Sequence, residues 1–173
     1  MKDLTILSND PSLTAWGWVV IKNGNIVDFG CIKTEPETKK KRIRKSDDRL
    51  RRISEINKVL LDLIEKHGIN YILSEAPHGS QNASSAIMIG ISLGVIQTVS
   101  DCLQISVESY SEDDCKKLIF GRKSVAKSEM VAMMFGKYHI TDKMSKYKAE
   151  AIADAIAVWH TAKHYSNVLK MIQ

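Results

Sequence analysis

The sequence predicts an α/β protein with a mixed five-stranded sheet and helices on both faces. Three strand-like runs come first, a long amphipathic helix then precedes a fourth strand, and strand and helix patterns follow to the end. Strands joined by tight turns pair antiparallel, whereas strands separated by a helix pair in parallel and need helices to cover the sheet. With 173 residues and 44% hydrophobic content, we expect a single domain over residues 1–173.

The first three strands form an antiparallel unit. Residues Leu4 to Ser8 are an apolar strand that stops at Asp10-Pro11, because proline cannot donate a ladder hydrogen bond. Residues 15–21 (AWGWVVI) are a second strand, and residues 26–32 are the returning strand. Asn23-Gly24 lies between them and is a strong two-residue hairpin signal.

A helix and a buried strand come next. We expect Ser46 to cap this helix and Gly68 to end it. Its apolar face is marked by Leu50, Ile53, Leu60 and Ile64. The run Tyr71 to Leu73 then predicts a strand parallel to the first, with Glu75 at its carboxyl end.

The second half alternates helices with one more strand. Gly90 and Gly94 lie four residues apart in a helix rich in small residues, and this spacing predicts a close backbone approach to the sheet. The expected elements are a helix over 83–102, a strand over 105–108 and helices over 112–120, 127–135 and 145–169.

Basic residues are concentrated in one segment. The chain has a net charge of +5, and Lys39 to Arg52 (KKKRIRKSDDRLRR) holds nine basic and two acidic residues. Such a segment is typical of a surface that binds phosphates, and equally of a solvated linker. No apolar run near the roughly 20 residues of a membrane helix and no signal peptide are apparent, so we expect a cytoplasmic protein.

Four carboxylates are candidate metal ligands. Asp10 and Glu75 follow the first and fourth strands, whose carboxyl ends should lie side by side. Glu150 and Asp154 have the i,i+4 spacing that places both on one helix face. Hard cations such as Mg²⁺ prefer oxygen ligands, and phosphodiester nucleases use pairs of ions about 4 Å apart. Singly, each of these residues is more often a turn, strand-end or solvated helix residue than a metal ligand, and it is their combination that indicates a site.

The order of these motifs resembles the RuvC-type Holliday-junction resolvases of the RNase H-like superfamily. Residues 6–13 (ILSNDPSL) followed by Gly17-Trp18 look like the opening of that family, with Asp10 in the place of its first catalytic aspartate. Glu75 and the small-residue helix after it are similar to the second motif, and residues 121–131 resemble the basic third motif. Residues 154–158 (DAIAV) match the closing pattern.

The sequence departs from the family at several positions. The residue three places before the last aspartate, usually acidic or histidine, is Ala151, and we expect Glu150 to supply that carboxylate. Asn9 stands where an aliphatic residue is usual, Ser12 replaces a common glycine, and Ala76 stands where bacterial enzymes often have an aromatic. These changes are typical of a phage-type or otherwise divergent member.

The resemblance implies a Mg²⁺-dependent endodeoxyribonuclease with two ions per site, for which Mn²⁺ is a possible substitute, acting as a homodimer on four-way DNA junctions. A dimer interface should use an apolar helix face, and the helix 83–102 is the candidate. Other branched DNA, structured RNA, or binding without catalysis are the alternatives. The residues expected to bind DNA phosphates are Lys39, Lys40, Lys41, Arg42, Arg44, Lys45, Arg122, Lys123 and Lys127.

Overall fold

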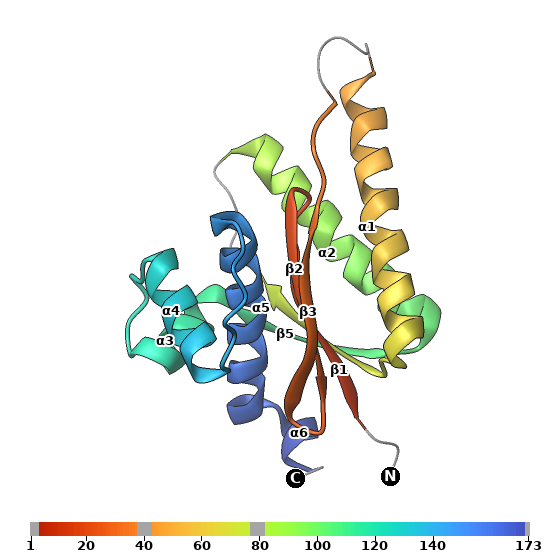
Figure 1. The fold of residues 1–173 in the computed structure, drawn as a ribbon. Coiled ribbons are helices and arrows are strands. Elements are labelled where there is room, and N and C mark those ends of the chain that lie inside the picture. The colour runs from red at the N-terminus through yellow and green to blue at the C-terminus, as the bar shows by residue number, and fades with distance from the viewer. Residues whose placement is uncertain (1–3, 38–42, 77–81, 172–173) are drawn as a thin grey trace.

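The strands form one mixed sheet in the order β3-β2-β1-β4-β5 (Figure 1). The computed structural model describes residues 4–37, 43–76 and 82–171. Strand β1 pairs antiparallel with β2 and parallel with β4, β3 extends the antiparallel side, and β5 extends the parallel side. The strands are β1 (Thr5–Asp10), β2 (Ala15–Lys22), β3 (Asn25–Lys33), β4 (Tyr71–Ala76) and β5 (Ser106–Ser111). The predicted fold class is confirmed.

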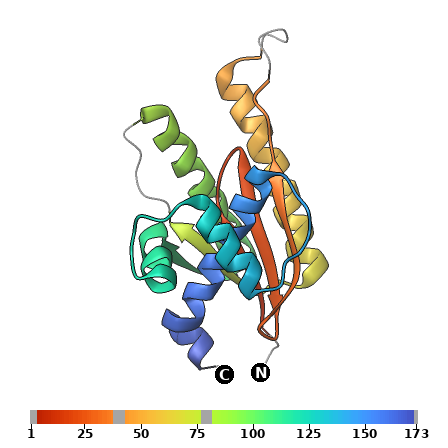
Figure 2. The same ribbon diagram turned by 60° about the vertical axis from the view of Figure 1, so that its left-hand side comes forward.

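Helices cover both faces of this sheet. Figures 1 and 2 show α1 and α2 on one face and α3, α4 and α5 on the other. The helices are α1 (Lys45–His67), α2 (Ala83–Leu103), α3 (Glu112–Phe120), α4 (Lys127–Lys137), α5 (Lys146–Tyr165) and the short α6 (Asn167–Lys170). The chain therefore has a hydrophobic core on each side of the sheet.

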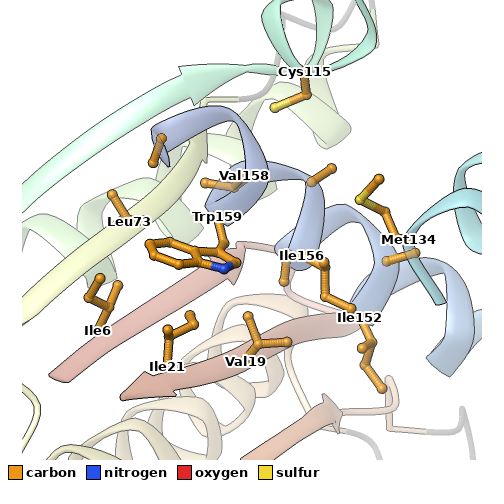
Figure 3. Packing of buried hydrophobic residues seen from close by; sticks show 14 of the residues in the cluster. Ile6, Val19, Ile21, Leu73, Cys115, Met134, Ile152, Ile156, Val158 and Trp159 are labelled. Atoms are coloured by element: carbon orange, nitrogen blue, oxygen red, sulfur yellow. The ribbon is translucent and has the colours of Figure 1, made fainter. Parts of the chain in front are cut away.

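Helix α5 is the centre of one core. Its residues from Ala151 to Ala162 are all buried, and Trp159 and Ile156 pack on Ile6 and Val19 of the sheet (Figure 3). On its other side α5 packs against α3 and α4. Because small alanine side chains alternate with larger residues from Ala151 to Ala157, α5 can lie close to the sheet.

The turns at the ends of elements mostly follow the sequence signals. Asn23 and Gly24 have φ of 50° and 76°, the positive values of a tight hairpin, and Gly68 ends α1 with φ of 66°. The cap predicted at Ser46 is wrong, because α1 begins at Lys45 and Ser46 lies inside it. Leu50 is 63% exposed, whereas Asp48 and Arg52 on either side of it are buried, so the inward face of α1 at this turn is made by Asp48 and Arg52 and Leu50 lies on the opposite face.

The long last helix predicted over 145–169 is interrupted. Helix α5 ends at Tyr165, and the Ser166 side chain accepts a hydrogen bond from the Leu169 backbone N–H at 3.1 Å, which caps α6. A serine that bonds its own backbone competes with helix continuation.

Helix α2 differs from expectation in two ways. A Cβ atom added to Gly90 or Gly94 would meet nothing within 4 Å, so the predicted close approach to the sheet is wrong and both glycines face outward. Helix α2 is also long and apolar enough, by length and composition alone, to cross a membrane, although the core helix of a soluble protein can pass the same test. In the sequence, serines and glycines interrupt the apolar residues of this helix, so no continuous apolar run is visible although charged residues are nearly absent. Only 28% of the most apolar 18-residue stretch of this helix is buried inside the protein.

Asn9 forms a buried polar network beneath the end of β1. Its Oδ1 accepts a hydrogen bond from Trp16 Nε1 at 3.0 Å, and its Nδ2 donates to the carbonyl oxygens of Leu7 at 3.3 Å and Leu73 at 3.2 Å. Asn9 and Trp16 have no exposed surface. Asn9, which stands where the family usually has an aliphatic residue, thus provides the acceptor for the Trp16 N–H and links β1 to β4.

We expect Asn9→Leu to destabilise the fold by about 1–3 kcal/mol, because the buried Trp16 N–H would lose its acceptor. Urea unfolding measures this loss. In an Asn9→Leu background, Trp16→Phe removes the unpaired N–H and should cost less than it does in the wild type. Equal costs in both backgrounds would show that the two residues are not energetically coupled.

Candidate active site

Three carboxylates from distant parts of the sequence meet at one edge of the sheet. Asp10 ends β1, and Glu75 lies one residue before the end of β4. The two strands are parallel neighbours, with Asn9 opposite Ser74. Both residues therefore leave the sheet at the same place, as the sequence predicts.

Helix α5 brings the third carboxylate, Asp154, to this edge. The Ser8 hydroxyl donates a hydrogen bond of 2.8 Å to the carbonyl oxygen of Ala155. Ser8 and Asp10 lie on the same face of β1, because side chains alternate along a strand. The bond thus fixes the residue next to Asp154 above the strand that carries Asp10.

A glycine in β2 sets the distance between helix α5 and the sheet. A Cβ atom at Gly17 would lie 1.9 Å from the carbonyl oxygen of Ala151, so the backbones of β2 and α5 touch there. Gly17 is the antiparallel partner of Asp10. The contact that glycine permits is therefore directly beside the first carboxylate.

Burial and mutual repulsion make these carboxylates reluctant to ionise. Glu75 and Asp154 are only 8% and 5% exposed. Burial, followed by the charge of Asp154, raises the pKa of Asp10 to about 7. Burial and the charges of Asp10 and Asp154 raise the pKa of Glu75 to about 9, and burial raises the pKa of Asp154 as well. Such shifts occur where several negative charges share a site.

One ammonium group partly compensates the cluster. Lys127, the first residue of α4, forms an ion pair through Nζ with Asp154 Oδ2. Burial disfavours the Lys127 charge, but the charges of Asp154, Asp10 and Glu75 hold its pKa above the ordinary value. The structure thus places Lys127, assigned to phosphate binding from the sequence, inside the carboxylate cluster.

Glu150 has different surroundings. It lies one turn before Asp154 on α5, and Lys146 Nζ is 3.9 Å from its Oε1. Its side chain is 26% exposed, whereas that of Asp154 is 7% exposed. Glu150 therefore lies nearer to solvent than Asp154 and has a lysine partner of its own.

Glu112 is the acidic neighbour that sequence reasoning missed. It begins α3 directly after β5, and its Oε1 lies 2.5 Å from Lys116 Nζ. Its charge raises the pKa of all three carboxylates. The available signal was its position, because an acidic residue that follows a third parallel strand should reach the same edge as Asp10 and Glu75.

The residues expected to bind DNA have varied environments. Arg44 and Lys45 are exposed at the start of α1, whereas Lys39, Lys40, Lys41 and Arg42 lie outside the described residues. Arg122 pairs with Glu129 at 2.8 Å, and Lys123 pairs with Asp113. These ion pairs are exposed, so phosphates can compete for the cations.

Arg52, at the end of the basic segment, has a structural role instead. It is 4% exposed. Its Nε donates to Thr34 Oγ1 at 2.7 Å, and its Nη2 donates to the Leu13 carbonyl oxygen at 2.9 Å. The reading of the whole Lys39–Arg52 segment as a phosphate-binding surface is wrong for Arg52, because this guanidinium ties α1 to the segment before β2 and to the residue after β3.

Relatives of the chain match it over nearly its whole length. Over 159 residues the chain is 29% identical to the crossover junction endodeoxyribonuclease RuvC of Ehrlichia canis (strain Jake), covering 90% of this chain and 93% of that protein. The RuvC of Francisella tularensis subsp. novicida (strain U112) is 25% identical over 169 residues, covering 95% and 93%.

Solved structures show the same architecture. The Thermus thermophilus RuvC in complex with Holliday junction substrate superposes with a TM-score of 0.73 at 19% identity, covering 95% of this chain and 96% of that one. The yeast mitochondrial Holliday junction resolvase Ydc2 gives a TM-score of 0.56 at 13% identity, covering 97% and 84%. At these identities the likeness establishes the RNase H-like fold.

The family model for crossover junction endodeoxyribonuclease RuvC matches residues 6–161, which include the three clustered carboxylates and Lys127. Because this match spans most of the chain, the protein belongs to the RuvC family of crossover junction endodeoxyribonucleases.

Proposed function

We propose that this protein is a divalent-metal-dependent endonuclease that resolves Holliday junctions by hydrolysing DNA phosphodiesters. The observation that carries the proposal is the convergence of Asp10, Glu75 and Asp154 at one sheet edge within a RuvC-family chain. The relatives from Ehrlichia canis and Francisella tularensis are both named crossover junction endodeoxyribonuclease RuvC. The roles of Asp10, Glu75 and Asp154 as metal ligands, and of the basic residues as DNA contacts, are part of this proposal.

The donor set fits Mg²⁺ or Mn²⁺. Three carboxylates supply hard oxygen ligands, and the Lys127 ammonium offsets one of their three negative charges. Divalent cations would neutralise the remaining negative charge. Among the described residues, no three Asp, Glu, His or Cys side chains stand close enough to share one ion as placed. Binding therefore requires Asp154 to exchange Lys127 for the metal and the side chains to converge.

The protein's residues would prepare the reaction by position and charge. Bound cations would activate the attacking water and stabilise the leaving 3′ oxygen, leaving a 5′-phosphate. Asp10 and Glu75 would hold the cations on strands whose register is fixed by the sheet, and Asp154 would close the site from α5. Lys127, once released from Asp154, would be free to contact the phosphate to be cleaved.

Cleavage of synthetic substrates tests the proposed function. We expect the protein to cut four-way junctions in Mg²⁺ or Mn²⁺, to leave them intact in EDTA, and to cut forks, linear duplexes and RNA much more slowly. Preferred cutting of linear duplex or RNA would contradict junction resolution. Junction binding without cleavage in either metal would show a binding module.

The sequence and the structure give different weight to Glu150, and one set of variants decides between them. If Glu150 is a ligand, Glu150→Gln lowers the cleavage rate strongly, and Ala151→Asp added to Glu150→Ala restores part of it. Because the structure pairs Glu150 with Lys146, we expect Glu150→Gln to lower the rate by less than about 10-fold, below a typical outer-shell loss. A larger loss at saturating Mg²⁺ would restore Glu150 to the ligand set.

Cations near the site and at the start of α1 would bind the DNA backbone. We expect neutralisation of Lys40, Lys41, Arg42 and Arg44 to weaken binding to all DNA sequences alike. It should also flatten the dependence of the binding constant on salt, because each phosphate contact releases counterions. Fluorescence anisotropy across a salt series measures the slope. An unchanged slope would identify the segment as a solvated linker.

Resolution requires two symmetric cuts, and we propose a two-fold homodimer formed through α2. Its outward residues Ala86, Gly90 and Gly94 follow one helix face and leave room for a close helix–helix contact. Ile87, on the same helix, is 50% exposed. Large exposed apolar faces mark association surfaces. Sedimentation equilibrium should give the dimer mass, and a monomer at micromolar concentrations would contradict this assignment.

A further inference from the structure

Glu112 leaves the sheet beside the catalytic carboxylates. Strand β5 is parallel to β4, with Tyr110 opposite Glu75 and Ser111 opposite Ala76. Glu112 follows Ser111 without a break, since α3 starts where β5 ends. Its backbone is therefore held at the same sheet edge as Glu75, by hydrogen-bonded strands rather than by a loop.

The first turn of α3 also faces α5. Cys115 is 2% exposed and belongs to the core that contains α5. The Lys116 charge acts on Asp154, and the Glu112 charge acts on all three carboxylates. The Glu112 side chain is only 31% exposed and reaches Lys116 at 2.5 Å. Glu112 is therefore paired with Lys116 in the same way as Asp154 is paired with Lys127, through a carboxylate–ammonium contact.

We propose that Glu112 is the fourth carboxylate of the metal site and helps Asp10, Glu75 and Asp154 hold the divalent cations. The inference rests on the proposed function, because it assigns a further residue to the same site. In the metal-free protein Lys116 neutralises Glu112, and a bound cation takes over this role. Glu112 occupies the place in the ligand set that the sequence suggested for Glu150.

A competing explanation makes Glu112 only a partner for Lys116. In that case the loss of its carboxylate would weaken metal binding indirectly, because an uncompensated ammonium repels the cation. The two explanations differ once Lys116 has no charge. A metal-binding Glu112 is then still needed, whereas a mere partner of Lys116 no longer matters.

Titration of Mn²⁺ into the DNA-free protein, followed by calorimetry, tests the inference without measuring catalysis. We expect Glu112→Gln to weaken Mn²⁺ binding by about 10- to 100-fold, the range for residues that support a metal site. Asp113→Asn is the matched control, because it removes the same charge from the next residue, which pairs with Lys123. It should leave binding near the wild-type value, and circular dichroism checks folding.

The decisive comparison is made in a Lys116→Met background. Persistence of the Glu112→Gln loss there supports direct participation, and its disappearance overturns the proposal. Wild-type Mn²⁺ affinity in Glu112→Gln also overturns it. Asp10→Asn separates this inference from the proposed function. If Asp10→Asn loses Mn²⁺ and Glu112→Gln does not, only this inference fails. If neither variant loses Mn²⁺, the metal site in the proposed function fails too.

Discussion

Asp10→Asn is expected to abolish junction cleavage while leaving junction binding nearly unchanged. The substitution keeps the size of the side chain but removes one negative charge from the cluster and weakens a proposed metal ligand. Loss of an outer-shell partner already costs roughly 10- to 100-fold, so loss of a direct ligand should exceed that range. Single-turnover cleavage and anisotropy with the same junction give the two values.

The stability of the metal-free protein provides an independent check on this variant. Because the pKa of Asp10 is raised to about 7 from 3.8, the folded state holds that proton more tightly than the unfolded chain. Ionisation of Asp10 therefore costs stability progressively as the pH rises from about 4 to about 7. Asp10→Asn should melt at a higher temperature than the wild type at pH 8 without metal. A lower melting temperature, with cleavage above a few per cent of wild type, would contradict the cluster.

Much of the fold follows from local signals that the structure keeps. The Asn23-Gly24 turn, the Gly68 helix end and the period of the apolar residues depend on short-range chemistry, and they predict the strand order through the connections they allow. The errors involve tertiary context. Leu50 has a spacing compatible with a buried face, but Asp48 and Arg52 occupy the buried side of α1 at that turn.

The site residues likewise fall into those that local signals predict and those that depend on tertiary packing. Asp10 and Glu75 could be paired from the sequence, because parallel neighbouring strands end at one edge. Glu112 could have been found by extending the same rule to β5. Neither the pairing of Lys127 with Asp154 nor the greater exposure of Glu150 could be read from spacing. They depend on how α4 and α5 pack, and helical periodicity gives no information about a neighbouring helix.

A close backbone approach between a helix and the sheet was expected from the sequence at Gly90 and Gly94, whereas the structure has such a contact at Gly17. All three are glycines beside apolar residues, so composition does not separate them. Only the path of α5 over β2 does so, because it brings the Ala151 carbonyl oxygen to within 1.9 Å of where a Gly17 Cβ would stand. Gly17 therefore controls the position of the helix that carries Asp154.

Gly17→Ala should consequently destabilise the fold more than an alanine at Gly30 or Gly136. Overpacking a core usually costs about 1–3 kcal/mol, and we expect Gly17→Ala to cost more than about 3 kcal/mol because the clash is with backbone and no rotamer change relieves it. Cleavage should fall in parallel, since α5 must lift away from β1 and take Asp154 with it.

The other two glycines calibrate this result. Gly136→Ala adds a methyl to α4 with nothing within 4 Å, so it should be neutral or stabilise by up to about 1 kcal/mol. At Gly30 the new Cβ would approach the Trp18 ring at 2.6 Å, a side chain that can shift, so Gly30→Ala should lie between the two. Urea unfolding of the three variants gives the order. If Gly17→Ala unfolds at the wild-type midpoint and cleaves normally, the contact between β2 and α5 does not set the position of Asp154.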